Sequence, residues 1–144
     1  MTHRPIRTII ENQEILTAPS TTTVSDAARL MRAHKIGALM VCDKKRLVGV
    51  FTERDALFRV TAEACDPKTT LLADVMTPNP QTIGPDKPLG HALHMMYEGG
   101  FRHVPVVENG RPIGMVSARD ALGPELKEFE SDVARRERIG EILG

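Results

Sequence analysis

The sequence of 144 residues is poor in aromatic side chains, with no tryptophan, one tyrosine and four phenylalanines. Proteins that bind single-stranded nucleic acid stack bases on such side chains, so their scarcity argues against that function. The chain also has no net charge, because 19 lysine and arginine residues balance 19 acidic ones. We therefore expect no broad electrostatic attraction to nucleic acid or to an anionic membrane.

Long apolar runs and paired cysteines are missing as well. No stretch approaches the roughly 20 apolar residues that a transmembrane helix needs, and the N-terminal MTHRPIRTII is too polar for a signal peptide. Cys42 and Cys65 lie in no CxxC or Cys/His ligand spacing, and Cys42 falls in an apolar run typical of a small core residue. These features predict a cytoplasmic protein that contacts neither membrane nor nucleic acid.

Motifs of catalysis are absent too. The chain contains no GxSxG, Walker-type loop, GxGxxG or HExxH motif and no defensible pairing of a nucleophile with a base. His91 and His94 are three residues apart on a predicted helix, but no carboxylate or cysteine at suitable spacing completes a metal site. We therefore predict no catalytic residues, no metal site and no enzymatic activity.

What the chain does contain is a repeat with an offset of 65 residues. Residues 37–57 read GALMVCDKKRLVGVFTERDAL, and residues 102–122 read RHVPVVENGRPIGMVSARDAL. A repeated core would explain the matching apolar residues. It would not by itself explain an arginine and an aspartate repeated at the same positions, next to a hydroxyl conserved as threonine in one copy and serine in the other. The repeat thus indicates two copies of one small binding unit.

Each copy has the pattern β-α-β-β-α. In the first copy a capping signature at Thr23 begins a helix, Gly37 ends it, and a polar turn joins two strands. The segments predicted there are an extended stretch near Ile15–Ala18, strands Ala38–Cys42 and Leu47–Thr52, and a helix from Glu53 to about Ala64. In the second copy they are an extended stretch near Pro80–Ile83, a helix from Leu89 to Glu98 ended by Gly99-Gly100, strands Val104–Val107 and Pro112–Ser117, and a helix opening near Arg119.

A unit of this size cannot bury both faces of its sheet alone. Two copies packed sheet against sheet solve that problem, so we predict an α/β (α+β) fold with pseudo-twofold symmetry. The expected divisions are an N-terminal arm at 1–14, repeat 1 at 15–65, a linker with a short helical turn at 66–79, repeat 2 at 80–123 and a charged helix at 124–144. The apolar side of that last helix either packs on the repeats or contacts another copy or a partner; it comprises Leu126, Phe129 and Val133, with Ile139, Ile142 and Leu143 beyond.

In each copy a strand ends in a hydroxyl residue and runs into a helix, with an aspartate three residues later. Free N–H groups at a helix N-terminus favour phosphate, and arginine adds a charged fork that suits phosphate oxygens. The aspartate can accept hydrogen bonds from the hydroxyls of a ribose. Ser/Thr-x-x-Asp is also an ordinary capping box. Its occurrence twice in the same register, each time with an arginine, favours the binding interpretation.

These residues resemble a known family. The two copies are similar to a tandem pair of CBS (cystathionine-β-synthase) domains, called a Bateman module, over about residues 15–123. The parts that match are GVFTERD, GMVSARD, RHVPVVENGRPIG and DVMTPNP. The resemblance implies a stand-alone bacterial-type CBS protein that senses AMP, ADP, ATP, NAD(H) or S-adenosylmethionine in two clefts. It also implies a homodimer that signals to an effector protein still to be identified.

The resemblance implies a role for particular residues. Asp55 and Asp120 would bind ribose, and the phosphate contacts would come from Thr52, Ser117, Arg54 and Arg119. The residues expected around adenine or the sugar are Ile36, Gly37, Ala38, Arg102, His103, Val104 and Pro105, with Thr17 and Thr82 on the entering extended stretches.

One of the differences between the copies is instructive: His103, flanked by Arg102, stands where the first copy has Ala38, flanked by Gly37. An imidazole there would titrate near neutral pH and could donate to phosphate, so the clefts would differ in affinity or in the number of phosphates they prefer. An ordinary structural histidine is the alternative. For the whole chain we predict a regulatory module that senses a nucleotide. The alternatives are an assembly module with vestigial clefts and, third, an enzyme such as a nucleotide hydrolase.

Overall fold

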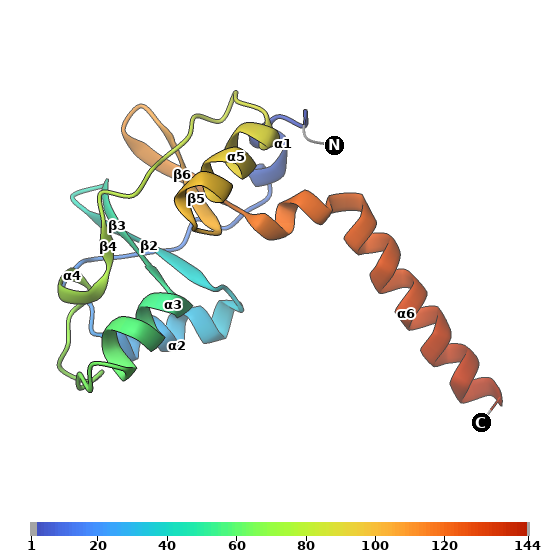
Figure 1. Ribbon diagram of the computed structural model, residues 1–144, viewed down its shortest axis with the longest axis horizontal. Coiled ribbons are helices and arrows are strands. Elements are labelled where there is room, and N and C mark those ends of the chain that lie inside the picture. Colours follow the sequence, from blue (N-terminus) through green and yellow to red (C-terminus); the bar gives the residue numbers. More distant parts are fainter. Residues whose placement is uncertain (1–2, 144) are drawn as a thin grey trace.

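The computed structural model describes residues 3–143, and among these the side chains of all but 124–128, 130 and 141–143. It is a mixed α/β fold in which the two repeats lie side by side and a long C-terminal helix leaves them (Figure 1). Each repeat has its own hydrophobic core. Strands β3 and β6 are in contact where the repeats meet.

The first repeat contains a four-stranded sheet in the order β1-β2-β3-β4. Strand β1 is parallel to β2, and the other neighbours are antiparallel. The strands are β1 Thr17–Ala18, β2 Ala38–Asp43, β3 Arg46–Thr52 and β4 Thr77–Pro78. Helix α2 spans Val24–His34, and α3 (Glu53–Asp55) continues as a π-helical segment, Ala56–Thr61, which ends before the predicted Ala64.

Helix α2 begins as predicted and ends differently. Thr23 caps it by accepting a hydrogen bond from Asp26 N at 3.2 Å. Its end is Lys35 and not Gly37, because Lys35 adopts the left-handed conformation with φ 53°. Lys35 N and Ile36 N then donate to the last free carbonyls of the helix, those of Arg32 and Met31.

The second repeat contains the hairpin β5 (His103–Glu108) and β6 (Arg111–Ser117), helix α5 (Leu89–Gly99) and the 3₁₀ helix Ala118–Leu122. The left-handed Gly100, with φ 72°, ends α5 in the predicted Gly-Gly pair. The extended stretch predicted at Pro80–Ile83 forms one parallel bridge, between Ile83 and Val106. That bridge corresponds to the pairing of Ala18 with Val41 in the first repeat.

The N-terminal segment, predicted as an arm outside the repeats, joins the core of the second one. Helix α1 (Ile6–Ile10) buries Ile6 and Ile10 in that core. Ile6 N donates to Lys87 O at 3.0 Å, and Leu89 N donates to Arg4 O at 2.7 Å. The apolar side chains of α1 are therefore part of the second repeat, although α1 precedes the first repeat in the sequence.

The linker serves the first repeat in the same way. Helix α4 (Leu72–Val75) buries Leu72 in the first core, and β4 pairs Thr77 with Val50. In the second repeat the amide of Gln13 takes the place of that strand, because its Oε1 accepts from Met115 N and its Nε2 donates to Met115 O, at 2.9 and 2.8 Å. The segment before repeat 1 thus completes repeat 2, and the linker between the repeats completes repeat 1.

The matched glycines Gly49 and Gly114 make room for these crossing segments. A Cβ on Gly114 would lie 2.8 Å from Cβ of Ile10, and one on Gly49 would meet the side chain of Met76. Both repeats therefore have glycine at this position because a larger side chain would collide with the segment that crosses there.

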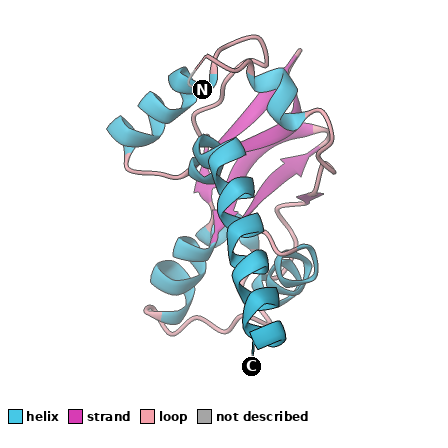
Figure 2. Cartoon of the chain, turned by 90° about the vertical axis from the view of Figure 1, so that its right-hand side faces the viewer, coloured by secondary structure: helices cyan, strands magenta, loops and turns pink. Residues whose placement is uncertain are grey.

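Helix α6 (Gly123–Leu143) extends away from both repeats, as Figures 1 and 2 show. Phe129 and Ile139 stay 64% and 48% exposed, so the described part of the helix does not pack on the repeats as one expectation had it. The side chains of Leu126, Ile142 and Leu143, assigned to the same apolar side, lie outside the described residues.

Candidate functional site

The strand-to-helix junctions form as the repeat predicted, and both are capped. Thr52 N donates to Asp55 Oδ2 at 3.0 Å, and Asp55 N donates to Thr52 Oγ1 at 3.1 Å. In the second repeat Ser117 N donates to Asp120 Oδ2 at 2.7 Å. Each aspartate therefore acts as a helix cap, so any ligand role is added to that structural role.

The two aspartates have different surroundings. Asp55 is 5% exposed, and its carboxylate also accepts from the Thr77 hydroxyl at 3.3 Å and lies 3.5 Å from Arg59 Nε. Asp120 is partly exposed, and among the described residues its carboxylate accepts only from Ser117. Oδ1 of Asp55 therefore has protein partners, whereas among the described residues none donates a hydrogen bond to Oδ1 of Asp120.

The junctions offer fewer free backbone donors than expected. Glu53 N donates to Gly37 O at 3.0 Å, and Ala118 N donates to Arg102 O at 2.9 Å. The helix after Ser117 is a short 3₁₀ turn, so the dipole that we expected to attract phosphate is small there. Positive charge at these sites comes from side chains and much less from the backbone.

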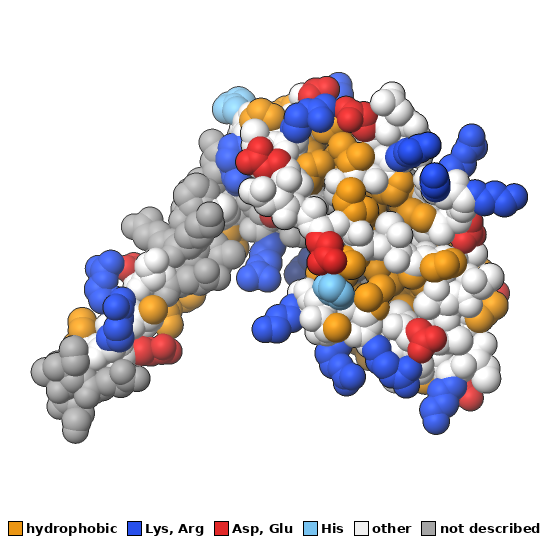
Figure 3. Space-filling view, turned by 180° about the vertical axis from the view of Figure 1, so that it is seen from behind, with side chains coloured by type: hydrophobic (Ala, Val, Ile, Leu, Met, Phe, Trp, Pro, Cys, Tyr) orange, Lys and Arg blue, Asp and Glu red, His pale blue; other side chains and the backbone are white. Residues whose placement is uncertain are grey.

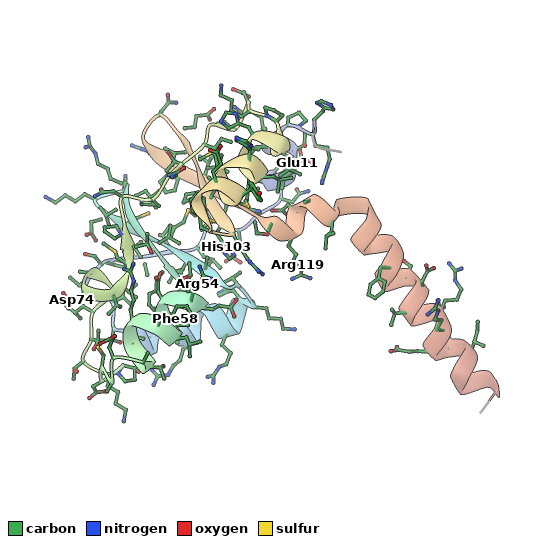
Figure 4. All side chains as sticks on the ribbon, viewed as in Figure 1. Glu11, Arg54, Phe58, Asp74, His103 and Arg119 are labelled. Carbon is green, nitrogen blue, oxygen red and sulfur yellow. The ribbon has the colours of Figure 1, made fainter. Side chains whose placement is uncertain are left out.

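The first cavity, of about 760 Å³, combines residues of both repeats. Thr52, Arg54 and Asp55 face the segment 99–103 of the second repeat across it. Arg54 spans the gap, since its Nη1 donates to Gly100 O at 3.3 Å while its guanidinium lies 5.7 Å from the centre of the Phe58 ring. Figure 4 shows Arg54 on the first repeat and His103 on the second, where the two repeats meet.

The second cavity, of about 410 Å³, repeats the arrangement with the roles exchanged. Ser117, Arg119 and Asp120 of the second repeat face Ile36, Gly37 and Ala38 of the first. The expectation was two clefts between the repeats, without a statement of which segments share one. In the structure each set of hydroxyl, arginine and aspartate faces the segment of the other repeat that was expected to hold adenine.

A third cavity, of about 800 Å³, adjoins both and is strongly basic. Four cationic side chains line it against one acidic side chain, that of Glu53; they are Arg32, Lys35, Arg102 and Arg119. Gly37 and His103 line all three cavities. From behind, Figure 3 shows Lys and Arg side chains gathered in the angle between the C-terminal helix and the repeats.

The structure thus has two clefts, each lined by residues of both repeats. Comparison with known families identifies the duplicated unit. The model of the CBS domain family matches the chain twice, over residues 6–62 and 72–123. This chain is a tandem CBS-domain protein. The first match begins at helix α1, which packs on the second repeat.

Known relatives support the same assignment. The chain is 40% identical over 116 residues to the CBS domain-containing protein CBSCBSPB3 of Arabidopsis thaliana, covering 80% of this chain and 21% of that protein. A putative signal-transduction protein with CBS domains from Burkholderia ambifaria has a similar structure, with a TM-score of 0.76, 30% identity and coverage of 81% and 89% of the two chains. An inosine-5'-monophosphate dehydrogenase of Korarchaeum cryptofilum is 34% identical, over 91% of this chain and 27% of the enzyme.

The chain thus spans about a fifth of the length of the first of these relatives. CBS domains are generally regulatory, ligand-binding modules. Among the described residues no helix is both long and apolar enough to cross a membrane.

His103 occupies the centre of the CBS pair. Burial lowers the pKa of its imidazole below the ordinary value of 6.5, against the opposing pull of Glu53 and Asp120. Arg102 adds to the lowering. The imidazole of His103 is therefore harder to protonate in the folded protein than an ordinary histidine.

Four expected ligand residues do not reach the cavities with their side chains. Thr17 and Thr82 are exposed and line none of the three. The side chains of Val104 and Pro105 are fully buried, so only their backbone could face a ligand.

Sequence reasoning missed two neighbours of Asp55. Arg59 follows it by four residues on one helix, a spacing that could have indicated an ion pair. Thr77 comes from the linker, 22 residues away, and carries no local signal. Concerning metals, the described residues contain no cluster of three potential ligands, and His94 lies 2.9 Å from Glu98.

Proposed function

We propose that this CBS pair binds an adenosine-containing nucleotide in its two crossed clefts and signals through a partner protein or a second copy. The observation that carries the proposal is that both repeats contribute residues to each cleft. In each cleft the hydroxyl, arginine and aspartate of one repeat face the adenine segment of the other. A ligand that touches both repeats favours the arrangement that suits it best, which is the physical requirement for a signal.

Of the two clefts, that of Asp120 is better suited to bind a nucleotide. Oδ1 of Asp120 can accept a hydrogen bond from a ribose hydroxyl, while Ser117 and Arg119 are placed beside it for phosphate. Ile36 and Ala38 supply apolar side chains for the base. Phosphates that point past Arg119 would enter the basic third cavity, which Arg119 also lines.

The experiment is thermal unfolding with AMP, ADP, ATP, NAD(H) and S-adenosylmethionine, followed by calorimetry and an assay for turnover. A ligand at a hundred times its Kd should add about 2.7 kcal/mol of stability. Asp120→Ala should weaken one binding step by about 10- to 100-fold, the value of a hydrogen bond to a charged group. Affinities that survive in the Asp55→Ala/Asp120→Ala variant would contradict the ribose assignment.

An assembly module with vestigial clefts is the second candidate. It is favoured by the carboxylate of Asp55, which the protein itself already occupies. Failure of all five ligands to stabilise the chain would support it. Turnover of any of them would support an enzyme instead.

A further inference from the structure

The basic third cavity adjoins both clefts and is larger than one of them. Its volume is about 800 Å³, against about 410 Å³ for the cleft of Asp120. Among the described residues none of its four cationic side chains has a partner in a hydrogen bond or an ion pair. On the same helix as Arg32, by contrast, Arg29 is paired with Asp26 at 2.9 Å. Cations that face one cavity without acidic partners repel each other, so an anion that enters the cavity stabilises the folded protein.

The border between this cavity and the cleft of Asp120 is positively charged. Lys35, Ser117 and Arg119 line both spaces. Each can bind a phosphate oxygen, the hydroxyl as a neutral donor and the two cations through charge-assisted hydrogen bonds. A ligand with its ribose at Asp120 can therefore extend its phosphates past Arg119 into the cavity.

The border between the same cavity and the cleft of Asp55 has a different charge. Arg102 and Glu53 line both spaces, so one cation is set against one carboxylate there. The hydroxyl and arginine of this junction, Thr52 and Arg54, line the cleft but not the cavity. A phosphate that leaves the cleft of Asp55 towards the cavity therefore meets a carboxylate where the other border offers two cations and a hydroxyl.

Glu53 is the residue that makes the two borders differ. Its backbone N donates to Gly37 O at 3.0 Å, and its side chain packs on Gly37, where a Cβ would collide with Oε1 of Glu53. Gly37 lines all three cavities, so this carboxylate lies close to where they meet. The second repeat has the uncharged Ala118 at the matching position. Repulsion of phosphate by a carboxylate thus acts at one border only.

We propose that the basic cavity receives the polyphosphate of a nucleotide whose ribose lies at Asp120, and that Glu53 restricts the cleft of Asp55 to ligands with fewer phosphates. This division rests on the proposed function and assigns a number of phosphates to each cleft. The cleft of Asp120 prefers a nucleoside triphosphate to a monophosphate. The cleft of Asp55 prefers the monophosphate or an adenosyl ligand without phosphate. One chain can thus hold two different ligands at the same time.

Calorimetry of AMP and ATP binding in EDTA tests the cavity, in an Asp55→Ala background where only the cleft of Asp120 is intact. Arg32 lines the basic cavity and neither cleft. Arg32→Gln should weaken ATP binding by about 10-fold or more, because a neutral donor replaces a charged one, and should change AMP binding by less than about 3-fold. The matched control is Arg29→Gln, which removes the same charge three residues earlier on α2 and should change neither affinity.

Exchange of the residues at the two borders tests the role of Glu53. Glu53→Gln in the Asp120→Ala variant should raise the affinity for ATP relative to AMP by at least about 5-fold, since the repelling charge is gone. Ala118→Glu in the Asp55→Ala variant should lower that ratio by a similar factor. Equal ratios in Asp55→Ala and Asp120→Ala, or ratios that neither substitution changes, would overturn the division of phosphates and leave the proposed function standing.

Inorganic tripolyphosphate separates the cavity from the nucleoside sites. It should bind the wild type without any nucleoside, and Arg32→Gln should weaken that binding by about 10-fold whereas Arg29→Gln should not. Such binding in a chain that no nucleotide stabilises would support the anion site and contradict the proposed function. Failure of tripolyphosphate to bind, or binding that does not depend on Arg32, would overturn the anion site. Circular dichroism and thermal unfolding confirm that each variant is folded.

Discussion

Asp55 and Asp120 stand at the same position of the two repeats and still have different chemistry. The difference arises from the segments that complete each repeat. The linker brings the Thr77 hydroxyl to the carboxylate of Asp55, whereas at the matching place Gln13 binds the backbone of Met115 and makes no hydrogen bond to the carboxylate of Asp120. Equivalent aspartates thus differ in the partners of their carboxylates among the described residues.

At the residue scale, substitutions in the turn between β2 and β3 should stabilise the folded protein. Lys44 and Lys45 have φ of 51° and 66°, a left-handed pair that the matching turn fills with Asn109 and Gly110. Left-handed backbone costs about 1–2 kcal/mol for a residue with a Cβ, and Asn-Gly is the preferred pair in such turns. Lys44→Asn/Lys45→Gly should therefore raise the free energy of unfolding by about 1 kcal/mol or more in urea. The reverse exchange, Asn109→Lys/Gly110→Lys, should lower it; equal stabilities would contradict the explanation.

His103 should make stability depend on pH. Burial lowers its pKa in the folded state, so the unfolded chain takes up a proton first as the pH falls. The contribution of His103 is complete above its ordinary pKa, and it decreases as the pH falls from about 6.5 towards the lower folded-state pKa. Urea unfolding from about pH 8 to about pH 5 should show a smaller loss of stability in His103→Gln than in the wild type. His91→Gln, at an exposed histidine, is the control; identical profiles for wild type and His103→Gln would refute this role.

At the scale of elements, α1 belongs to the second repeat although it precedes the first. Ile6 is completely buried there. Ile6→Ala should lower the free energy of unfolding by about 2–5 kcal/mol, as for other large core side chains. Ile15→Ala, at a side chain that is 49% exposed, should change it by less than about 1 kcal/mol. Similar small effects of both substitutions would show that α1 is a dispensable arm.

Most elements follow from local pattern. The two hairpins and α2 and α5 lie where turn residues, caps and apolar spacing predicted them, to within a few residues. The exceptions are short segments with no pattern of their own. Strand β4 exists because Thr77 and Pro78 lie beside β3, and the extended stretch before Ile83 forms a single bridge, to Val106 of β5.

At the scale of the whole molecule, the clefts belong to neither repeat alone. Arg102 of the second repeat lines the cavity of Asp55 and is absent from the cavity of Asp120. If nucleotide binds as proposed, Arg102→Ala should weaken the cleft of Asp55 by about 10-fold or more, because it removes a charged donor.

Calorimetry in two backgrounds separates the clefts. Arg102→Ala should reduce the binding that remains in Asp120→Ala, where only the cleft of Asp55 is intact. It should reduce less the binding that remains in Asp55→Ala, because Arg102 lines the basic third cavity but not the cleft of Asp120. The opposite pattern would mean that each site lies within a single repeat.

The sequence by itself determined the repeat, the order of its elements, the capped junctions at Thr52 and Ser117 and the membership of the CBS family. These follow from contacts between residues close in the chain, where spacing and residue type suffice. Only the tertiary structure decided which segment completes which repeat, which partners each carboxylate has and which residues share a cleft. Those outcomes depend on contacts such as that between Gln13 and Met115, 102 residues apart, and no local pattern records how such distant segments meet.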